Sequence, residues 1–214
     1  MSKTFTPRML SLITGISYFI IFFAAIFANF FVIEALLNNP KQAVQSSPLF
    51  IRAGTLAFMI TVIFDIVIAW SLYELYKTHP LSGLAALFRM AHAIIMGVAI
   101  SALPFVFSSI SGEEILRYVS VFNTIWLIGL FFFGVHLILL GNIIGRPKII
   151  AVFLVIAGFM YMLDTAAHFM LSDYETYASI FLALVAIPSI FGEMSFAIWL
   201  LIKGGKNVQK ANAY

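Results

Sequence analysis

Long apolar runs alternate with short polar segments along the whole chain. A helix needs about 20 consecutive, predominantly apolar residues to cross a bilayer. Six runs meet this requirement, at residues 9–33, 49–76, 81–108, 118–144, 149–171 and 177–202. The segments between them hold turn-forming or charged residues, as in LNNPKQAVQSSP at 37–48 and SISGEEILR at 109–117. The pattern predicts an all-α polytopic membrane protein, in which six transmembrane helices form a single membrane domain over residues 1–214 and end in a short polar tail at 203–214.

The composition agrees with a membrane protein. Of the 214 residues, 63% are hydrophobic and 10% are charged, whereas a soluble domain has about 45–50% apolar and about 25% charged residues. The principal partner is therefore expected to be the lipid bilayer. A net charge of only +3, spread along the chain, does not indicate nucleic-acid binding. The chain has no cysteine, which excludes disulfides, thiolate metal sites and cysteine nucleophiles. No feature of the pattern sets an oligomeric state.

Lysine and arginine are distributed unequally between the two sides of the predicted bundle. If the N-terminus lies in the cytoplasm, the cytoplasmic segments hold Lys3, Arg8, Lys77, Arg146, Lys148, Lys203, Lys206 and Lys210. The external segments then hold only Lys41, Arg52 and Arg117. Short cytoplasmic loops carry the excess of basic residues in multi-pass proteins. We therefore expect both termini to be cytoplasmic, in a multi-pass protein of the bacterial inner (plasma) membrane.

Five ionisable side chains lie inside four of the predicted spans: Asp65, Arg89, His92, His136 and Glu193. Counted from the cytoplasmic end of its span, each is roughly eight to eleven residues deep. Ionisable residues within a membrane face the interior of the bundle and pair with one another. The sequence therefore predicts one buried polar layer towards the cytoplasmic side, and this layer is the candidate ligand-binding site.

Two interpretations of this layer need no cofactor. In the first, the protein binds, senses or carries a small molecule, with Arg89 receiving an anionic or carbonyl-bearing ligand and Glu193 or Asp65 acting as a protonatable partner. In the second, Arg89 forms a buried ion pair that only fixes the packing of the helices. The chain has no Walker-type loop, no H-E-x-x-H and no G-x-S-x-G sequence. A non-enzymatic role is therefore favoured.

Two further interpretations use the histidines to hold a cofactor. An intramembrane metalloenzyme would use His92, His136 and Glu193 as metal ligands, because imidazole and carboxylate suit zinc or iron, with Asp65 as general base or orienting group. A haem protein would use His92 and His136 as axial ligands. A second polar pair, Asp164 and His168, is spaced i, i+4 on one helix face nearer the external side. There the carboxylate would hold the imidazole in one tautomer or make a plain hydrogen bond.

Glycines and one proline add expectations about packing. The glycines at 129, 134, 141, 145 and 158 are predicted to be contacts between helices rather than parts of a ligand loop. Pro188 lies five residues before Glu193. A proline frees the carbonyl one turn back, so Pro188 is expected to shape the surroundings of Glu193.

Several motifs resemble a known family. They are GISY at 15–18, FRMAH at 88–92, GVHLILLG at 134–141, GFMYMLD at 158–164 with His168, GE at 192–193 and WLLIKG at 199–204. Together they resemble the bacterial multi-pass membrane proteins grouped as domain of unknown function 4386, over residues 10–204. The resemblance implies a membrane fold. It transfers no activity, because none is attached to that family.

Overall fold

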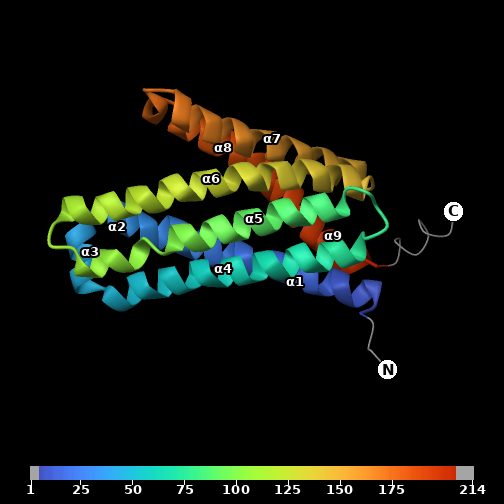
Figure 1. Ribbon diagram of the computed structural model, residues 1–214, viewed down its shortest axis with the longest axis horizontal. Coiled ribbons are helices and arrows are strands. Elements are labelled where there is room, and N and C mark those ends of the chain that lie inside the picture. Colours follow the sequence, from blue (N-terminus) through green and yellow to red (C-terminus); the bar gives the residue numbers. More distant parts are fainter. Residues whose placement is uncertain (1–4, 206–214) are drawn as a thin grey trace.

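The six apolar runs fold as six helices of membrane-spanning length. The computed structural model describes residues 5–205, and its helices are shown in Figure 1. The spans cover Pro7–Asn38, Pro48–Leu75, Ser82–Ser108, Gly112–Ile144, Lys148–Met170 and Ala178–Lys203. This confirms an all-helical bundle of six spans. Most ends lie within two residues of those predicted, whereas the first span ends at Asn38 rather than at residue 33 and the fourth begins at Gly112 rather than at residue 118. Residues 206–214 of the predicted polar tail lie outside the described residues.

Three of the spans are single α-helices, and three change their helical geometry along their length. The second, fourth and fifth spans are α4 (Pro48–Leu75), α6 (Gly112–Ile144) and α7 (Lys148–Met170). The first span consists of α1 (Pro7–Ile26), the π-helical η1 (Phe27–Ile33) and α2 (Glu34–Asn38). The third consists of α5 (Ser82–Ile100) and the 3₁₀ helix η2 (Leu103–Ser108). The sixth consists of α8 (Ala178–Ser189), the π-helical η4 (Ile190–Met194) and α9 (Ser195–Lys203).

Two segments predicted as loops are partly helical. The segment at 37–48 contains α3 (Pro40–Ser46), which begins at a proline whose fixed φ suits the first position of a helix. The fourth span begins at Gly112 rather than at residue 118 because Ser111 and Glu114 cap it. The Ser111 Oγ accepts a hydrogen bond from the Glu114 backbone N–H at 3.1 Å, and Glu114 Oε2 accepts from the Ile110 N–H at 2.9 Å. The S-x-x-E spacing is the sequence signal for this cap.

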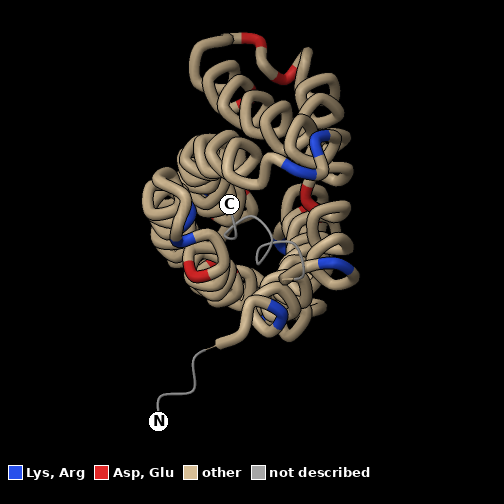
Figure 2. Tube along the Cα trace, turned by 90° about the vertical axis from the view of Figure 1, so that its right-hand side faces the viewer, with Lys and Arg blue, Asp and Glu red and all other residues tan. Residues whose placement is uncertain are grey.

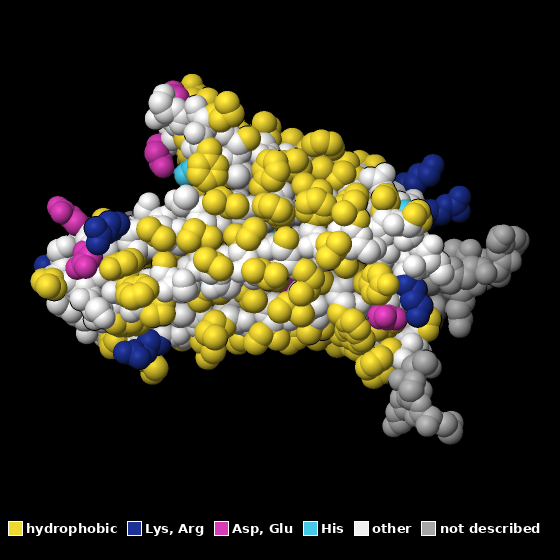
Figure 3. All heavy atoms as spheres, in the orientation of Figure 1, with side chains coloured by type: hydrophobic (Ala, Val, Ile, Leu, Met, Phe, Trp, Pro, Cys, Tyr) yellow, Lys and Arg dark blue, Asp and Glu magenta, His cyan; other side chains and the backbone are white. Residues whose placement is uncertain are grey.

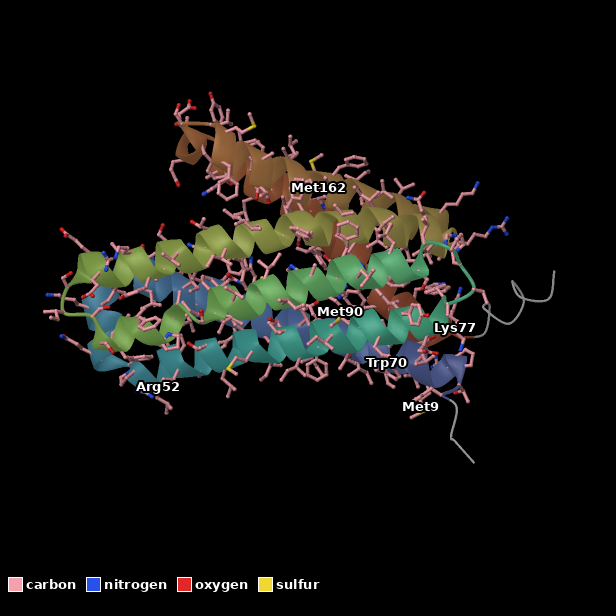
Figure 4. The ribbon with its side chains drawn as sticks, in the orientation of Figure 1. Met9, Arg52, Trp70, Lys77, Met90 and Met162 are labelled. Carbon is pink, nitrogen blue, oxygen red and sulfur yellow. The ribbon has the colours of Figure 1, made fainter. Side chains whose placement is uncertain are left out.

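The surface of the bundle is divided into two charged ends and an apolar belt. Figure 3 shows charged side chains gathered at the two ends and a mainly hydrophobic face between them. Figure 4 shows Lys77 and Trp70 towards one end and Arg52 towards the other. Large side chains such as Phe23, Leu87 and Ile94 are more than half exposed in this belt. Such an extensive exposed apolar surface fits a lipid bilayer and not water.

The first and last described residues lie at the same end of the bundle. Arg8 donates from Nη2 to the Leu201 carbonyl at 2.7 Å and from Nη1 to the Leu200 carbonyl at 3.2 Å. These carbonyls belong to the last turn of α9, where a cation interacts favourably with the helix dipole. Figure 2 looks at this end and shows lysine and arginine positions around it.

Consecutive spans pack beside one another, and the sixth closes back on the first. α4 packs against α1 and α5, α6 packs against α5 and α7, and α8 packs against α7. α9 instead packs against α1. Pro188 lies in the last turn of α8, two residues before η4 begins, and it cannot donate a backbone hydrogen bond to the preceding turn. Figure 1 shows α7 and α8 leaning away from the other helices at the end opposite the chain ends.

Glycines bring α6 and α7 close together. A Cβ atom added to Gly134 would lie 2.6 Å from the Gly158 carbonyl oxygen, and one added to Gly141 would lie 2.7 Å from the Ala151 carbonyl oxygen. Neither distance leaves room for a side chain. Helix packing was predicted for Gly134, Gly141 and Gly158, and it is confirmed.

The other two glycines named for packing behave differently from each other. A Cβ on Gly129 would lie 3.3 Å from His92 Nδ1, so this glycine does lie against α5. Gly145 has φ +59° and follows the last residue of α6 with nothing within 4 Å of its Cβ position. The packing prediction is therefore wrong for Gly145, which reverses the chain direction after a helix instead.

Candidate functional site

Arg89 is the centre of the polar layer. It lies on α5 and is 1% exposed. Its Nη2 donates to Asp65 Oδ1 on α4 at 2.6 Å, and its Nη1 donates to the Tyr18 hydroxyl on α1 at 3.1 Å. Nη1 also lies 3.2 Å from His136 Nε2 on α6. The guanidinium therefore joins four helices. Its Nε is the one buried nitrogen of this group without a partner among the described residues.

The hydrogen bonds of His136 define its protonation state. Its Nδ1 lies 2.9 Å from the Ala85 carbonyl, which can only accept, so Nδ1 carries the proton. The other ring nitrogen, Nε2, faces the Arg89 Nη1, which can only donate. Nε2 is therefore unprotonated, and His136 is a neutral acceptor for Arg89.

His92 lies on the other side of Asp65. Its Nδ1 donates to the Gly129 carbonyl at 2.9 Å, and its Nε2 lies 3.6 Å from Asp65 Oδ2. The ring packs against Phe133, with 4.9 Å between the ring centroids. The Asp65 carboxylate is thus flanked by Arg89 and His92, and the charges of Asp65 and Arg89 neutralise each other inside the bundle.

The structure brings together four of the five residues predicted for the polar layer: Asp65, Arg89, His92 and His136. We call these four the polar cluster. The fifth, Glu193, lies on η4 and faces a cavity beside the cluster. Within the described residues Glu193 makes no hydrogen bond or ion pair. Its electrostatic interactions reach Arg89 and Asp65, so it belongs to the same region without contacting either residue.

The cavity has a volume of about 560 Å³. The first and sixth spans form its walls, and α4, α5 and α6 contribute residues from the other side. Asp65, Arg89 and His92 line its inner end, whereas Glu34, Asp164 and Tyr174 line its outer end. The segment between these ends is lined mainly by apolar side chains, among them Ile21, Phe30, Trp126, Leu130 and Leu182.

Both walls of the cavity contain π-helical turns. η1 contributes Asn29 and Phe30, and η4 contributes Ile190 and Glu193. Single π-helical turns occur frequently at functional sites, because they redirect side chains within an otherwise regular helix. Phe30 and Ile190 are exposed, as is Leu182 on α8, so the opening of the cavity lies within the apolar belt.

The cavity does not continue past the polar cluster. On the far side of His136 lies a separate void of about 10 Å³, lined by Tyr76, Ser82 and Ala85 among others. This is about the volume needed to hold one water molecule. Arg89 and its partners therefore close the inner end of the large cavity.

The donor geometry does not fit the proposed metal or haem sites. Among residues 5–205 no group of three or more His, Asp or Glu side chains is arranged to hold a metal ion. A ligating imidazole must present an unprotonated nitrogen to the metal, and that of His136 accepts from Arg89. His92 Nε2 faces Asp65 instead. The sets His92/His136/Glu193 and His92/His136 are therefore not assembled as ligand sites in this structure.

The outer polar pair, Asp164 and His168, is connected through Tyr174, which was not among the predicted site residues. Tyr174, in the short 3₁₀ helix η3 (Tyr174–Thr176), donates its hydroxyl to Asp164 Oδ1 at 2.6 Å. Its ring lies 4.5 Å from the His168 ring. No hydrogen bond joins Asp164 to His168 in the described chain, which differs from the predicted pairing, because Tyr174 occupies the carboxylate. Burial and the neighbouring Asp164 raise the pKa of Tyr174, which keeps its hydroxyl a donor.

Replacement of Tyr174 by phenylalanine tests this connection. We expect Tyr174→Phe to lower the free energy of unfolding by about 1 kcal/mol, the usual contribution of one such hydrogen bond. Tyr177→Phe is the matched control, since Tyr177 is exposed on the same segment. Unfolding of both variants can be followed by circular dichroism in detergent. Equal stability of the two variants would contradict a role for the Tyr174–Asp164 hydrogen bond.

Three tyrosines at the site were not among the predicted site residues: Tyr18, Tyr161 and Tyr174. The sequence could have indicated them, because each is a tyrosine inside or beside an apolar span, and a buried tyrosine hydroxyl normally finds a hydrogen-bond partner. Tyr18 fulfils this expectation through Arg89. The spacing of the ionisable residues alone did not reveal it.

Comparisons with known proteins identify the family of this chain and assign no activity. A protein from Archaeoglobus fulgidus, described as an uncharacterized protein, is 29% identical over 153 residues, which cover 69% of this chain and 81% of that protein. No solved structure matches this chain. The family model described as Domain of unknown function (DUF4386) matches residues 13–204, and the chain belongs to this family.

Proposed function

We propose that this member of the family binds a small molecule in the cavity between its first and sixth spans, as a binding, sensing or carrier protein. The observation that carries the proposal is the cavity of about 560 Å³ with apolar walls and polar groups at its inner end. Ligand sites are typically concave, about 300–1,000 Å³ in volume, mostly apolar and supplied with a few placed polar groups. The cavity has each of these properties.

The shape of the cavity supports binding from one side. Its outer part is bordered by η1 and α8, and in the described chain α8 packs mainly against α7. The polar cluster closes the inner end. A ligand is therefore expected to enter from the outer end or through the apolar belt and to stop at Arg89, Asp65 and Glu193.

We also infer that both chain ends lie in the cytoplasm and that the protein spans the inner (plasma) membrane of a bacterial cell. The end that carries the chain termini holds five described basic residues: Arg8, Lys77, Arg146, Lys148 and Lys203. The opposite end holds Lys41, Arg52 and Arg117. This bias supports the orientation by the positive-inside rule. Lys3, Lys206 and Lys210, which the sequence analysis also counted, lie outside the described residues.

Single cysteines test access to the cavity, because the chain has no cysteine of its own. Ala25 and Ala186 line the cavity from opposite walls, whereas Ala93 is fully buried and does not line it. We expect an impermeant methanethiosulfonate added outside intact cells to modify Ala25→Cys and Ala186→Cys. The rate should exceed that of Ala93→Cys by about tenfold or more, since a buried cysteine reacts only after local opening. Equal rates for the three variants would contradict an accessible cavity.

The same variants test occupancy and orientation. A neutral apolar probe, N-phenyl-1-naphthylamine, is expected to slow modification of Ala186→Cys and to leave Ser172→Cys unchanged, because Ser172 is exposed outside the cavity. Ser172→Cys should also react from outside the cell if the proposed orientation holds. Reaction of Ser172→Cys only in inverted vesicles would overturn the orientation.

A further inference from the structure

We propose that the cavity selects lipophilic cations, meaning organic ammonium or phosphonium ions with an apolar body, and that Glu193 supplies the opposing charge. This inference rests on the proposed small-molecule site and adds the chemical class of its ligand. It departs from the anionic ligand that the sequence suggested, because both terminal nitrogens of Arg89 already have partners in Asp65, Tyr18 and His136.

The first observation is the charge of the lining. Four carboxylates line the cavity, from Glu34, Asp65, Asp164 and Glu193, against one arginine, Arg89, and one histidine, His92, both of which face Asp65. Arg89 is already paired with Asp65 at 2.6 Å, and its other terminal nitrogen faces Tyr18 and His136. His136 is a neutral acceptor, as described above. The lining therefore has more carboxylates than basic side chains, and within residues 5–205 no basic side chain pairs with Glu193.

The second observation is the position of Glu193. It projects from η4 near the inner end of the cavity and has no hydrogen-bond or ion-pair partner within residues 5–205. The charged groups within its electrostatic range, Arg89 and Asp65, are already paired with each other at 2.6 Å. A carboxylate at membrane depth is costly without a partner. A cationic ligand headgroup would supply the missing partner.

The third observation is the aromatic character of the walls. Phe22, Trp126 and Tyr161 line the cavity, in addition to Tyr18 and Phe133, whose rings already lie beside the Arg89 guanidinium at 5.0 and 5.2 Å. Aromatic faces attract organic cations, and this attraction increases when water is excluded. The Arg89 guanidinium thus already lies against two aromatic rings, and further aromatic rings line the cavity.

The apolar walls favour an organic cation over a metal ion. A divalent metal such as Ca²⁺ takes about six to eight oxygen ligands, and the described residues contain no group of acidic or histidine side chains able to hold a metal ion. Most of the lining consists instead of side chains such as Leu130, Leu182 and Met194. These would contact the apolar body of the ligand while Glu193 meets its charge.

Two probes of the same shape and opposite charge test the inference. Tetraphenylphosphonium and tetraphenylborate are added separately to the full chain in detergent, and the thermal midpoint and the protection of Ala186→Cys from modification are measured. A ligand that binds only the folded protein raises the midpoint. We expect tetraphenylphosphonium to raise it and to protect the cysteine, and tetraphenylborate to do neither.

Glu193→Gln is the decisive variant, with Glu113→Gln as its matched control because Glu113 is exposed outside the cavity. We expect Glu193→Gln to weaken tetraphenylphosphonium binding by about tenfold or more through loss of the desolvated charge pair, and Glu113→Gln to leave it unchanged. Without ligand, Glu193→Gln should be at least as stable as the parent protein, because it removes a partly buried carboxylate that has no ion-pair partner among the described residues. A loss of stability would show that Glu193 serves packing and would overturn the inference.

The remaining outcomes separate this inference from the proposed function. Equal protection by both ions, or by the neutral N-phenyl-1-naphthylamine alone, would overturn selection for cations and leave the small-molecule site intact. Protection by none of the three probes would overturn both. Tetraphenylphosphonium binding that Glu193→Gln does not weaken would overturn the role of Glu193.

Discussion

Arg89→Met is expected to lower the free energy of unfolding by about 3–5 kcal/mol, the usual cost of leaving one member of a buried ion pair without its partner. In the parent protein Asp65 Oδ1 accepts from Arg89 Nη2 at 2.6 Å in a site that is almost fully buried. The variant leaves the carboxylate without this charge. It also deprives Tyr18 and His136 of a donor. Unfolding by sodium dodecyl sulfate in mixed micelles measures the effect.

The double variant Arg89→Met/Asp65→Leu tests whether the loss of stability in Arg89→Met comes from leaving the Asp65 charge unpaired. It removes both ions, and we expect it to be more stable than Arg89→Met alone, because apolar replacement of a whole buried pair is often nearly neutral. Arg117→Met, at an exposed position on α6, should change the stability by less than about 0.5 kcal/mol. If the double variant were less stable than Arg89→Met, the ion pair would not be the source of the effect.

Gly158→Leu is expected to cost about 3 kcal/mol or more, because it forces a side chain into a closely packed crossing. A Cβ at Gly158 would lie 2.8 Å from the Ile138 side chain, and it would lie closer still to the Gly134 carbonyl oxygen. The backbone of α6 cannot move away without losing its contacts with α7. The same detergent unfolding measurement applies, together with the yield of monodisperse protein.

Gly97→Leu is the matched control for that substitution. Gly97 lies in the third span with nothing within 4 Å of its Cβ position. A glycine in the middle of a helix costs roughly 0.5–1 kcal/mol relative to alanine, so its replacement should be neutral or stabilising. Similar losses at Gly97 and Gly158 would indicate that helix propensity, and not the crossing of α6 with α7, determines the outcome.

The sequence predicted those features that depend on composition over many residues. An apolar run of about 20 residues has few alternatives to a spanning helix, and the six spans were found with small errors at their ends. The polar cluster was also predictable in outline. Asp65, Arg89 and His92 must find partners inside the bundle, because each lies within an apolar span. The hydrogen-bond partner of each side chain, however, depends on how each helix is rotated about its own axis, and the sequence does not give that rotation.

The features that the sequence did not reveal have local causes. The depth of Glu193 in its span placed it at the level of Arg89, and it lies beside the polar cluster, but depth alone does not show which side chains make contact. Pro188 and η4 alter the course of the sixth span before Glu193 and turn it towards the cavity. The π-helical turn η1 has the sequence FANFFVI, which contains no proline from which a change of helical geometry could have been predicted. The cavity lies between the first and sixth spans, where α8 packs mainly against α7 while α9 packs against α1, and these contacts join distant parts of the chain.

Because the cavity opens towards the lipid between η1 and α8, the apparent affinity for a ligand would depend on how strongly that ligand partitions into the bilayer. A compound that dissolves in the bilayer reaches this opening by diffusing in two dimensions, and its local abundance depends on its partition coefficient. Its apparent dissociation constant, referred to the aqueous concentration, will then decrease as the compound becomes more oil-soluble, even if every contact in the cavity is unchanged. Occupancy is better expressed as moles of compound per mole of lipid. If the proposed site binds such a compound, the acyl chains next to the exposed side chains of Phe30 and Leu182 would serve as its solvent reservoir.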